Sequence, residues 1–186
     1  HPFNFDKKII ARLIKLCRPL ATQLTTEMAG FVIFLKLVAH IGTIELDSSE
    51  IVFNVMHASF LPAAGLGQAC ATIVGKSLGE KNHNKAYNSI YETIRLSILF
   101  MGTTGLLLFF FPYYILRFFT INEIVIEMGI PVLKLLGLFQ VIDAICQTLW
   151  FSLNGAGDTK FPAFTQMILM WIFFIPLCWI SVMVFN

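Results

Sequence analysis

The chain alternates between long apolar stretches and short polar ones. Three stretches contain no Asp, Glu, Lys or Arg: Ile51 to Gly75, Leu96 to Leu116, and Phe161 to Asn186. Two more, Pro19 to Ala39 and Pro131 to Phe151, each contain one acid and one lysine. Because a helix that crosses a bilayer needs about 20 mostly apolar residues, this pattern predicts five membrane-spanning helices.

The polar segments between these stretches read GTIELDSSE, KSLGEKNHNKAYN, RFFTINE and NGAGDTK. In the last of them, Asp158 and Thr159 follow Gly155 and Gly157, which predicts a helix stop and then an N-cap. The apolar stretches are about twice as long as a membrane β-strand and do not alternate with period two. We therefore expect an all-α membrane protein. Its spans are predicted near residues 19–40, 51–75, 89–116, 128–152 and 161–185.

Composition supports lipid as the main surroundings. Hydrophobic residues make up 57% of the 186 positions and charged residues 13%, whereas soluble domains carry about 25% charged residues. The net charge is only +2. There is no dense basic patch with interleaved aromatic residues, so we expect no nucleic-acid partner.

The basic residues lie mostly on one side of the predicted spans. Arg117 falls on the other side, and Lys36 and Lys134 lie near that side, where a lysine can extend its amine to the interface. By the excess of Lys and Arg, we expect the first residues and the 76–88 and 154–160 connections to be cytoplasmic. The basic residues on this side are Lys7, Lys8, Arg12, Lys15, Arg18, Lys76, Lys81, Lys85, Arg95 and Lys160.

Two carboxylates fall at the same depth inside predicted spans. Glu27 is eight residues beyond Pro19, and Asp143 is eight residues before Phe151, the two cytoplasmic ends. At 1.5 Å per residue, each lies about 12 Å inside the membrane. Charges at such depths are costly and usually functional, and transporters place ion and substrate sites near the midplane. We therefore predict that Glu27 and Asp143 form a cation or proton site.

Carboxylates suit such a site because they ligate Na⁺ as hard oxygen ligands and can also accept a proton. A cationic organic substrate would be attracted to the same negative centre. Neutral side chains that could add ligands or line a cavity are Gln23, Thr25, Thr26, Asn54, Gln140 and Gln147. His57 also lies in a span, and we favour a hydrogen-bonded interior residue over a titrating one.

A bracing role is the alternative for the two acids. Lys36 and Lys134 are each nine residues from the acid of their own span, which places them about half a turn out of phase. A pair within one helix is thereby excluded, but a pair between helices stays open.

Pro19 and Pro62 interrupt spans, and Gly65 and Gly67 follow Pro62 in a run of small residues. Small residues let helices approach closely in lipid, so we favour packing over flexing for this run. The four cysteines form no CxxC pair, and no catalytic or nucleotide-binding motif is present. We expect no enzyme activity, no cofactor and no metal other than Na⁺ at Glu27 and Asp143.

Three blocks of sequence resemble the multidrug and toxic compound extrusion (MATE) transporters, in the NorM-like branch. They are CRPLATQLTTE at residues 17–27, FLPAAGLGQACATIVGKSLGEKNHNKA at residues 60–86, and LNGAGDTKFP at residues 153–162. Their order and spacing match the family across nearly the whole chain. Asn154 differs, because many members have Arg there.

The resemblance implies a fold of twelve helices in two six-helix lobes. Residues 1–18 would be a cytoplasmic inter-lobe linker, and residues 19–186 would supply five helices of the C-terminal lobe. Both ends would then be cuts inside a longer protein that carries the N-terminal lobe. In this branch an acid of helix seven and one of helix ten form the cation site, and Glu27 and Asp143 stand at those positions.

The family exports cationic, amphiphilic drugs in exchange for Na⁺ or H⁺. The resemblance therefore implies a multi-pass antiporter of the inner cell membrane, with lipid and small organic cations as partners. A flippase for lipid-linked precursors from the same superfamily, a non-transporting membrane scaffold, and an intramembrane enzyme are the alternatives. A flippase would need a much more basic cleft than this sequence predicts.

Overall fold

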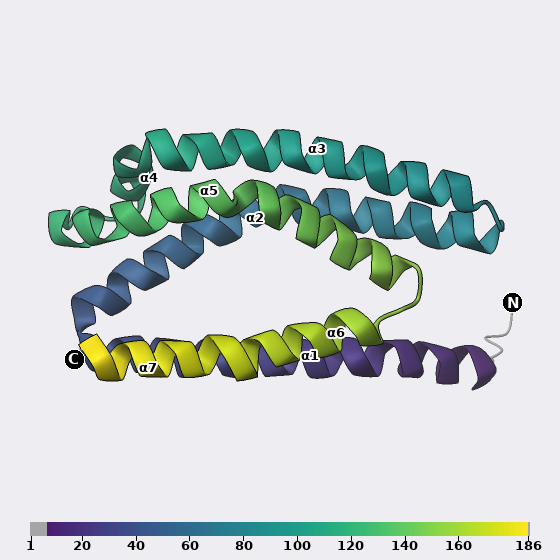
Figure 1. Cartoon of the computed structure of the whole chain (residues 1–186), viewed down its shortest axis with the longest axis horizontal. Helices are drawn as coiled ribbons and strands as arrows, with labels where there is room; N and C mark the ends of the chain where they lie inside the picture. Colours follow the sequence, from purple (N-terminus) through teal and green to yellow (C-terminus); the bar gives the residue numbers. More distant parts are fainter. Residues whose placement is uncertain (1–6, 186) are drawn as a thin grey trace, which may run out of the picture. The chain divides into compact units, whose positions relative to one another are not determined.

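The computed structural model describes residues 7–185 of the chain, and the described part is almost entirely helical (Figure 1). Positions 1–6 of the predicted linker lie outside the described residues. The elements are α1 (Lys7–Ile41), α2 (Thr43–Gly79), α3 (His83–Phe110), α4 (Pro112–Phe119), α5 (Glu123–Gly155), α6 (Lys160–Ile168), the π-helical segment η1 (Leu169–Phe174) and α7 (Ile175–Phe185).

Within the described residues, five helices are long and apolar enough to cross a membrane. They are α1, α2, α3, α5 and the continuous run from Lys160 to Met183. The predicted all-α membrane fold is confirmed. The run from Lys160 includes η1, and such π-helical turns are rare and occur often at functional sites.

The first two helices extend further than the sequence predicted. α1 begins at Lys7, so the described part of the predicted linker is helical and continuous with the first span. The polar segment GTIELDSSE, which connects the first two predicted spans, is helical from Thr43 onward, and Gly42 alone separates α1 from α2. Glu45 lies in the first turn of α2, where a negative charge interacts favourably with the helix dipole.

The predicted third span, residues 89–116, is broken in the structure. α3 ends at Phe110, and α4 starts afresh at Pro112. Proline has no N–H to continue a helix and disfavours helical geometry at the residue before it. Phe111 accordingly has φ −123° and ψ 38°.

The turns on the predicted cytoplasmic side are closed by side chains. The Asn82 Oδ1 accepts the backbone N–H of Lys85 at 3.0 Å and caps α3. After α5, Gly157 adopts φ 89°, which favours glycine. The Asp158 Oδ1 then accepts the N–H of Phe161 at 3.3 Å. The predicted stop and cap are confirmed, with Asp158 as the capping side chain.

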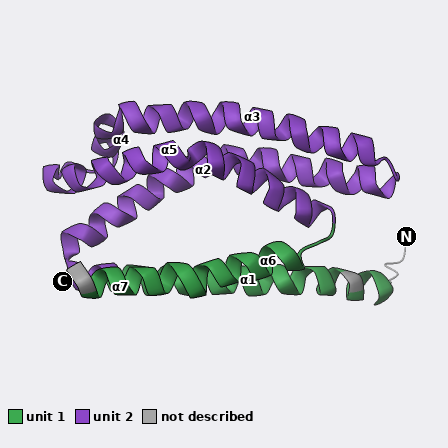
Figure 2. Ribbon diagram, in the orientation of Figure 1, with its two compact units in different colours: residues 1–37, 157–186 green, residues 38–156 purple. Residues whose placement is uncertain are grey.

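The chain divides into two compact units, residues 1–37 with 157–186 and residues 38–156 (Figure 2). In the second unit, α2, α3 and α5 pack against one another, and α4 packs on α5. α2 and α5 run parallel to each other, and α3 runs antiparallel to both (Figure 1). α2 bends about half-way along its length, and Pro62 lies near the middle of its residue range.

α3 and α5 meet backbone to backbone at a pair of glycines. A Cβ built on Gly105 would lie 2.5 Å from the carbonyl oxygen of Gly137, and one built on Gly137 would lie 2.7 Å from that of Gly105. The Thr148 hydroxyl lies 3.1 Å from that of Ser97 in the same interface. Small residues and polar contacts of this kind hold helices together in lipid, because the transfer of an apolar side chain from lipid into a helix contact contributes little free energy.

The outward faces of the second unit are apolar. Leu99, Phe110 and Leu138 are exposed by 67%, 66% and 62% respectively. A soluble protein would not expose so many large apolar side chains in a contiguous area. These faces therefore suit contact with lipid or with other membrane helices.

The first unit joins α1 to the last helical run by side-chain contacts. A Cβ on the buried Gly30 would meet the Met170 side chain of η1. The rings of Phe34 and Phe174 have centroids 5.6 Å apart. The π-helical segment thus faces α1 within this unit.

The run of small residues in α2 contains one packing glycine and one free of contact. A Cβ on Gly67 would lie 2.8 Å from the Phe151 Cγ, whereas a Cβ on Gly65 would meet no atom of the described chain within 4 Å. Gly67 therefore lies at a close contact between α2 and α5, and Gly65 does not.

Gly67→Ala is therefore expected to destabilise the protein by about 1 kcal/mol through overpacking. Gly65→Ala is expected to leave stability unchanged or to raise it by about 0.5 kcal/mol, because glycine weakens a helix interior. Thermal unfolding of the two detergent-purified variants checks this. Equal melting temperatures would contradict the packing role of Gly67.

Candidate functional site

Glu27 lies in the middle of α1 and is half-buried. The Gln23 Nε2, one turn earlier, donates a hydrogen bond to the Glu27 Oε1 at 2.9 Å. Gln23 is only 2% exposed, and its Oε1 has no hydrogen-bond partner among the described residues. The amide therefore holds the carboxylate in place and presents a second, unpaired oxygen beside it.

Hydroxyl groups surround this turn of α1. Thr22, Thr25 and Thr26 donate to backbone carbonyls one turn earlier, at 2.9, 2.9 and 2.6 Å. Their oxygens keep free lone pairs, because a hydroxyl that donates can still accept. Such back-bonding also weakens and often bends a helix, and Pro19 in the same helix removes one backbone hydrogen bond.

In α5, Asp143 is half-buried and has an amide on either side, one turn away. Gln140 is fully buried, and its Nε2 donates to the Ser59 Oγ of α2 at 2.5 Å. The Gln140 Oε1 is buried without a partner in the described chain, and so is the Gln147 Oε1. Two unpaired amide oxygens thus lie next to the carboxylate along the helix.

A stripe of polar groups continues from Asp143 toward the end of α5. Gln140, Asp143, Gln147, Trp150 and Asn154 recur at intervals of three and four residues, which places them on one face of the helix. Within the described residues, the Trp150 Nε1 and the Asn154 Oδ1 are also buried and unpartnered. Our sequence reasoning missed Trp150 and treated Asn154 only as a departure, although this spacing was visible.

The register of α2 against α5 places Asp143 level with a proline. Gln140 contacts Ser59, and a Cβ on Gly67 would touch Phe151. α2 and α5 are parallel, and the residues that face each other differ in number by 81 at the first contact and by 84 at the second. Asp143 therefore lies level with residues 59–62 of α2. Pro62 has no N–H, and the carbonyl of the residue four positions earlier loses its usual helical donor. A backbone oxygen is therefore available in α2 near this level.

Other predicted site residues are less enclosed. Asn54, Pro62 and Gly65 are exposed on α2. His57 is exposed too, and its role as a hydrogen-bonded interior residue of the complete protein stays a prediction.

The structure brings Glu27 together with Gln23, and Asp143 together with Gln140 and Gln147. The two acids belong to different units, so their joint site stays a prediction. In residues 7–185, neither acid forms an ion pair, and Lys36 and Lys134 are exposed. Within that range no three His, Cys, Asp or Glu side chains gather as transition-metal ligands. Carboxylates with neutral oxygens suit an alkali cation or a proton.

Comparison with known proteins gives consistent matches. The family model described as MatE matches residues 19–180. The chain is 30% identical over 174 residues to a probable multidrug resistance protein NorM of Thermotoga maritima, covering 94% of this chain and 38% of the relative.

Two further relatives agree. A probable multidrug resistance protein NorM of Mannheimia succiniciproducens is 28% identical, and a multidrug resistance protein NorM of Aliivibrio fischeri is 25% identical. In both, the match covers 92% of this chain and 37% of the relative. The chain thus spans less than two-fifths of the length of these relatives.

Proposed function

Because the chain belongs to the MatE family, we propose that it forms most of the C-terminal lobe of a drug exporter in the inner cell membrane. The complete protein exchanges a cationic or amphiphilic drug for Na⁺ or H⁺. It acts as a transporter without a cofactor, and its other lobe completes the central cleft. The names of its relatives support the export of drugs.

The observation that carries this proposal is the pair of carboxylates inside apolar helices, each beside amides with unpaired, buried oxygens. A lone buried charge is costly in a membrane and usually serves a function. At each acid, the neighbouring amide oxygens could replace part of the hydration shell of an ion. In our proposal Glu27 and Asp143 are the residues that couple transport to the ion, with Gln23, Gln140 and Gln147 as auxiliary ligands.

The exchange follows from competition at this site. With the cleft open to the cytoplasm, the ionised carboxylates attract a drug cation. After the lobes rearrange, an external Na⁺ or H⁺ neutralises the acids and releases the drug. This drives transport only if the ion binds one conformation better than the other. Pro62, level with Asp143, and the threonines near Glu27 mark places where α2 and α1 can bend.

The test uses the full-length protein in proteoliposomes loaded with a fluorescent organic cation. We expect efflux when either a Na⁺ gradient or a proton gradient is imposed, and the effective gradient identifies the coupling ion. Transfer of a lipid-linked precursor without gradient-driven efflux would favour the flippase. If the liposomes showed neither activity, the transporter proposal would be wrong and a scaffold role would replace it.

A further inference from the structure

A basic cavity lies in the first unit, between α1 and the start of α6. It has a volume of about 410 Å³, and its lining includes Lys15, Arg18, Thr22 and Lys160. Lys15, Arg18 and Thr22 are spaced by three and four residues, so they share one face of α1. Lys160 is the first residue of α6. Three cations from two helices thus converge on one hollow.

The positive charge of this cavity is not neutralised by the chain around it. In the part of the chain that the structure describes, its lining contains no acidic side chain, and none of the three cations forms an ion pair. Asp158 lies two residues before Lys160 but is not part of the lining, and its Oδ1 accepts the N–H of Phe161. The three basic side chains are exposed and can reorient toward a ligand.

The cavity also has an apolar part, formed by Ile14 and Pro19. Pro19 opens the apolar stretch of the first span. The cavity therefore lies where the basic end of α1 meets the hydrocarbon boundary. Anionic lipids of the cytoplasmic leaflet attract basic residues at this level. An amphiphile with a phosphate beside the start of its acyl chains matches both parts of the lining.

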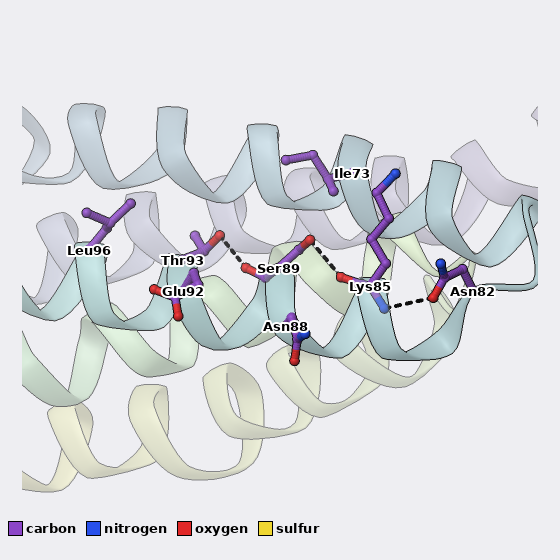
Figure 3. A pocket seen from close by; sticks show the side chains of 8 residues that line it. All are labelled: Ile73, Asn82, Lys85, Asn88, Ser89, Glu92, Thr93 and Leu96. Atoms are coloured by element: carbon purple, nitrogen blue, oxygen red, sulfur yellow. Dashed lines mark hydrogen bonds between the residues drawn. The ribbon is translucent and has the colours of Figure 1, made fainter.

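A second hollow, between α2 and α3, lacks this charge imbalance. It measures about 610 Å³, and Figure 3 shows Lys85 and Glu92 among its lining residues. Lys85 pairs with Glu80 at 3.5 Å, and Glu92 pairs with Arg95 at 3.2 Å. An anion gains little there, because Lys85, the one basic residue of this lining among the described residues, already pairs with Glu80. This groove provides a matched comparison on the same predicted side of the membrane.

We propose that the cavity of Lys15, Arg18 and Lys160 binds the phosphate headgroup of an anionic phospholipid from the cytoplasmic leaflet. The cations hold the phosphate, and Pro19, which follows Arg18 at the start of the span, contacts the first part of the acyl chains. This site is separate from Glu27 and Asp143 and does not depend on the proposed exchange reaction.

The test is a lipid titration of the detergent-purified full-length protein, followed by native mass spectrometry. The probes are phosphatidylglycerol, phosphatidylcholine with the same acyl chains, and soluble glycerol 3-phosphate. A basic residue near the membrane surface contributes a factor of about five in binding. We therefore expect Lys15→Gln/Arg18→Gln to weaken phosphatidylglycerol binding by about 25-fold, and Lys160→Gln alone by about fivefold.

The control is Lys76→Gln/Lys85→Gln, which removes the same charge from α2 and α3 and should change binding less than about twofold. Lys160→Gln changes one exposed side chain and leaves the helices intact. If this variant bound phosphatidylglycerol with wild-type affinity, the proposal would be wrong, even if the double variant failed to fold. An equal loss in the control would show non-specific attraction and would overturn it as well. An anionic lipid site would also be refuted if phosphatidylcholine or glycerol 3-phosphate bound as tightly as phosphatidylglycerol.

Discussion

Glu27→Gln and Asp143→Asn are each expected to abolish gradient-driven efflux by the full-length protein. Each change removes one negative charge and keeps nearly the same side-chain volume, so the helices should still pack. A hydrogen bond or ligand contact to a charged group contributes about 1.5–3 kcal/mol, which corresponds to roughly 10- to 150-fold in cation affinity. The measurement is initial efflux of a fluorescent cation from proteoliposomes under the effective gradient.

The matched control is Glu127→Gln, which neutralises an exposed acid of the same helix as Asp143. It should retain wild-type efflux, because Glu127 lies near the start of α5 and away from the amides around Asp143. Full efflux in both Glu27→Gln and Asp143→Asn would refute the proposed site. If only one of the two variants lost efflux, the site would contain that carboxylate alone, and the other acid would not belong to it.

Gly105→Leu is expected to destabilise the helix bundle strongly. Even a Cβ at this position would approach the Gly137 carbonyl oxygen to 2.5 Å, and a backbone atom cannot rotate away as a side chain can. Overpacking typically costs about 1–3 kcal/mol, and leucine adds three further carbons to the clash. We expect a melting temperature several degrees lower and more aggregation in size-exclusion chromatography after heating.

Gly102→Ala provides the control for this prediction. It lies three residues earlier in α3, and the nearest atom to its added Cβ would be a methyl carbon of Val141 at 3.7 Å, an ordinary contact. Its melting temperature should equal or slightly exceed that of the wild type, because alanine favours a helix interior over glycine. If Gly105→Leu unfolded at the wild-type temperature, the close crossing of α3 and α5 would be wrong.

The membrane spans follow from the sequence by itself, and so does the prediction of a cation or proton site at the two acids. Lipid cannot hydrogen-bond a backbone, so an apolar stretch of sufficient length must form a helix. The depth of Glu27 and Asp143 then follows from the rise per residue. Asp158 was also predictable as a cap, because a helix end needs only neighbouring residues to satisfy its N–H groups.

Local sequence also contained signals that our reading missed. Pro112 predicts the break between α3 and α4, yet the uncharged stretch around it suggested one uninterrupted span. The polarity of GTIELDSSE predicts a connection between two spans, but a helix can project beyond the bilayer and remain solvated, and this segment is helical from Thr43 onward. Polarity marks the membrane boundary, whereas helix ends depend on backbone geometry and capping.

Only the tertiary structure decided which helix faces meet. The contact of Gly105 with Gly137 and the bond from Gln140 to Ser59 depend on the register between separate helices, and no local preference sets that register. The same holds for His57, which periodicity alone could not assign to a covered or an uncovered face. A helix in lipid is apolar on most sides, so its pattern identifies the span but not its neighbour. The neighbour is selected by close backbone approach and by the pairing of buried polar groups, which arise only once the helices pack.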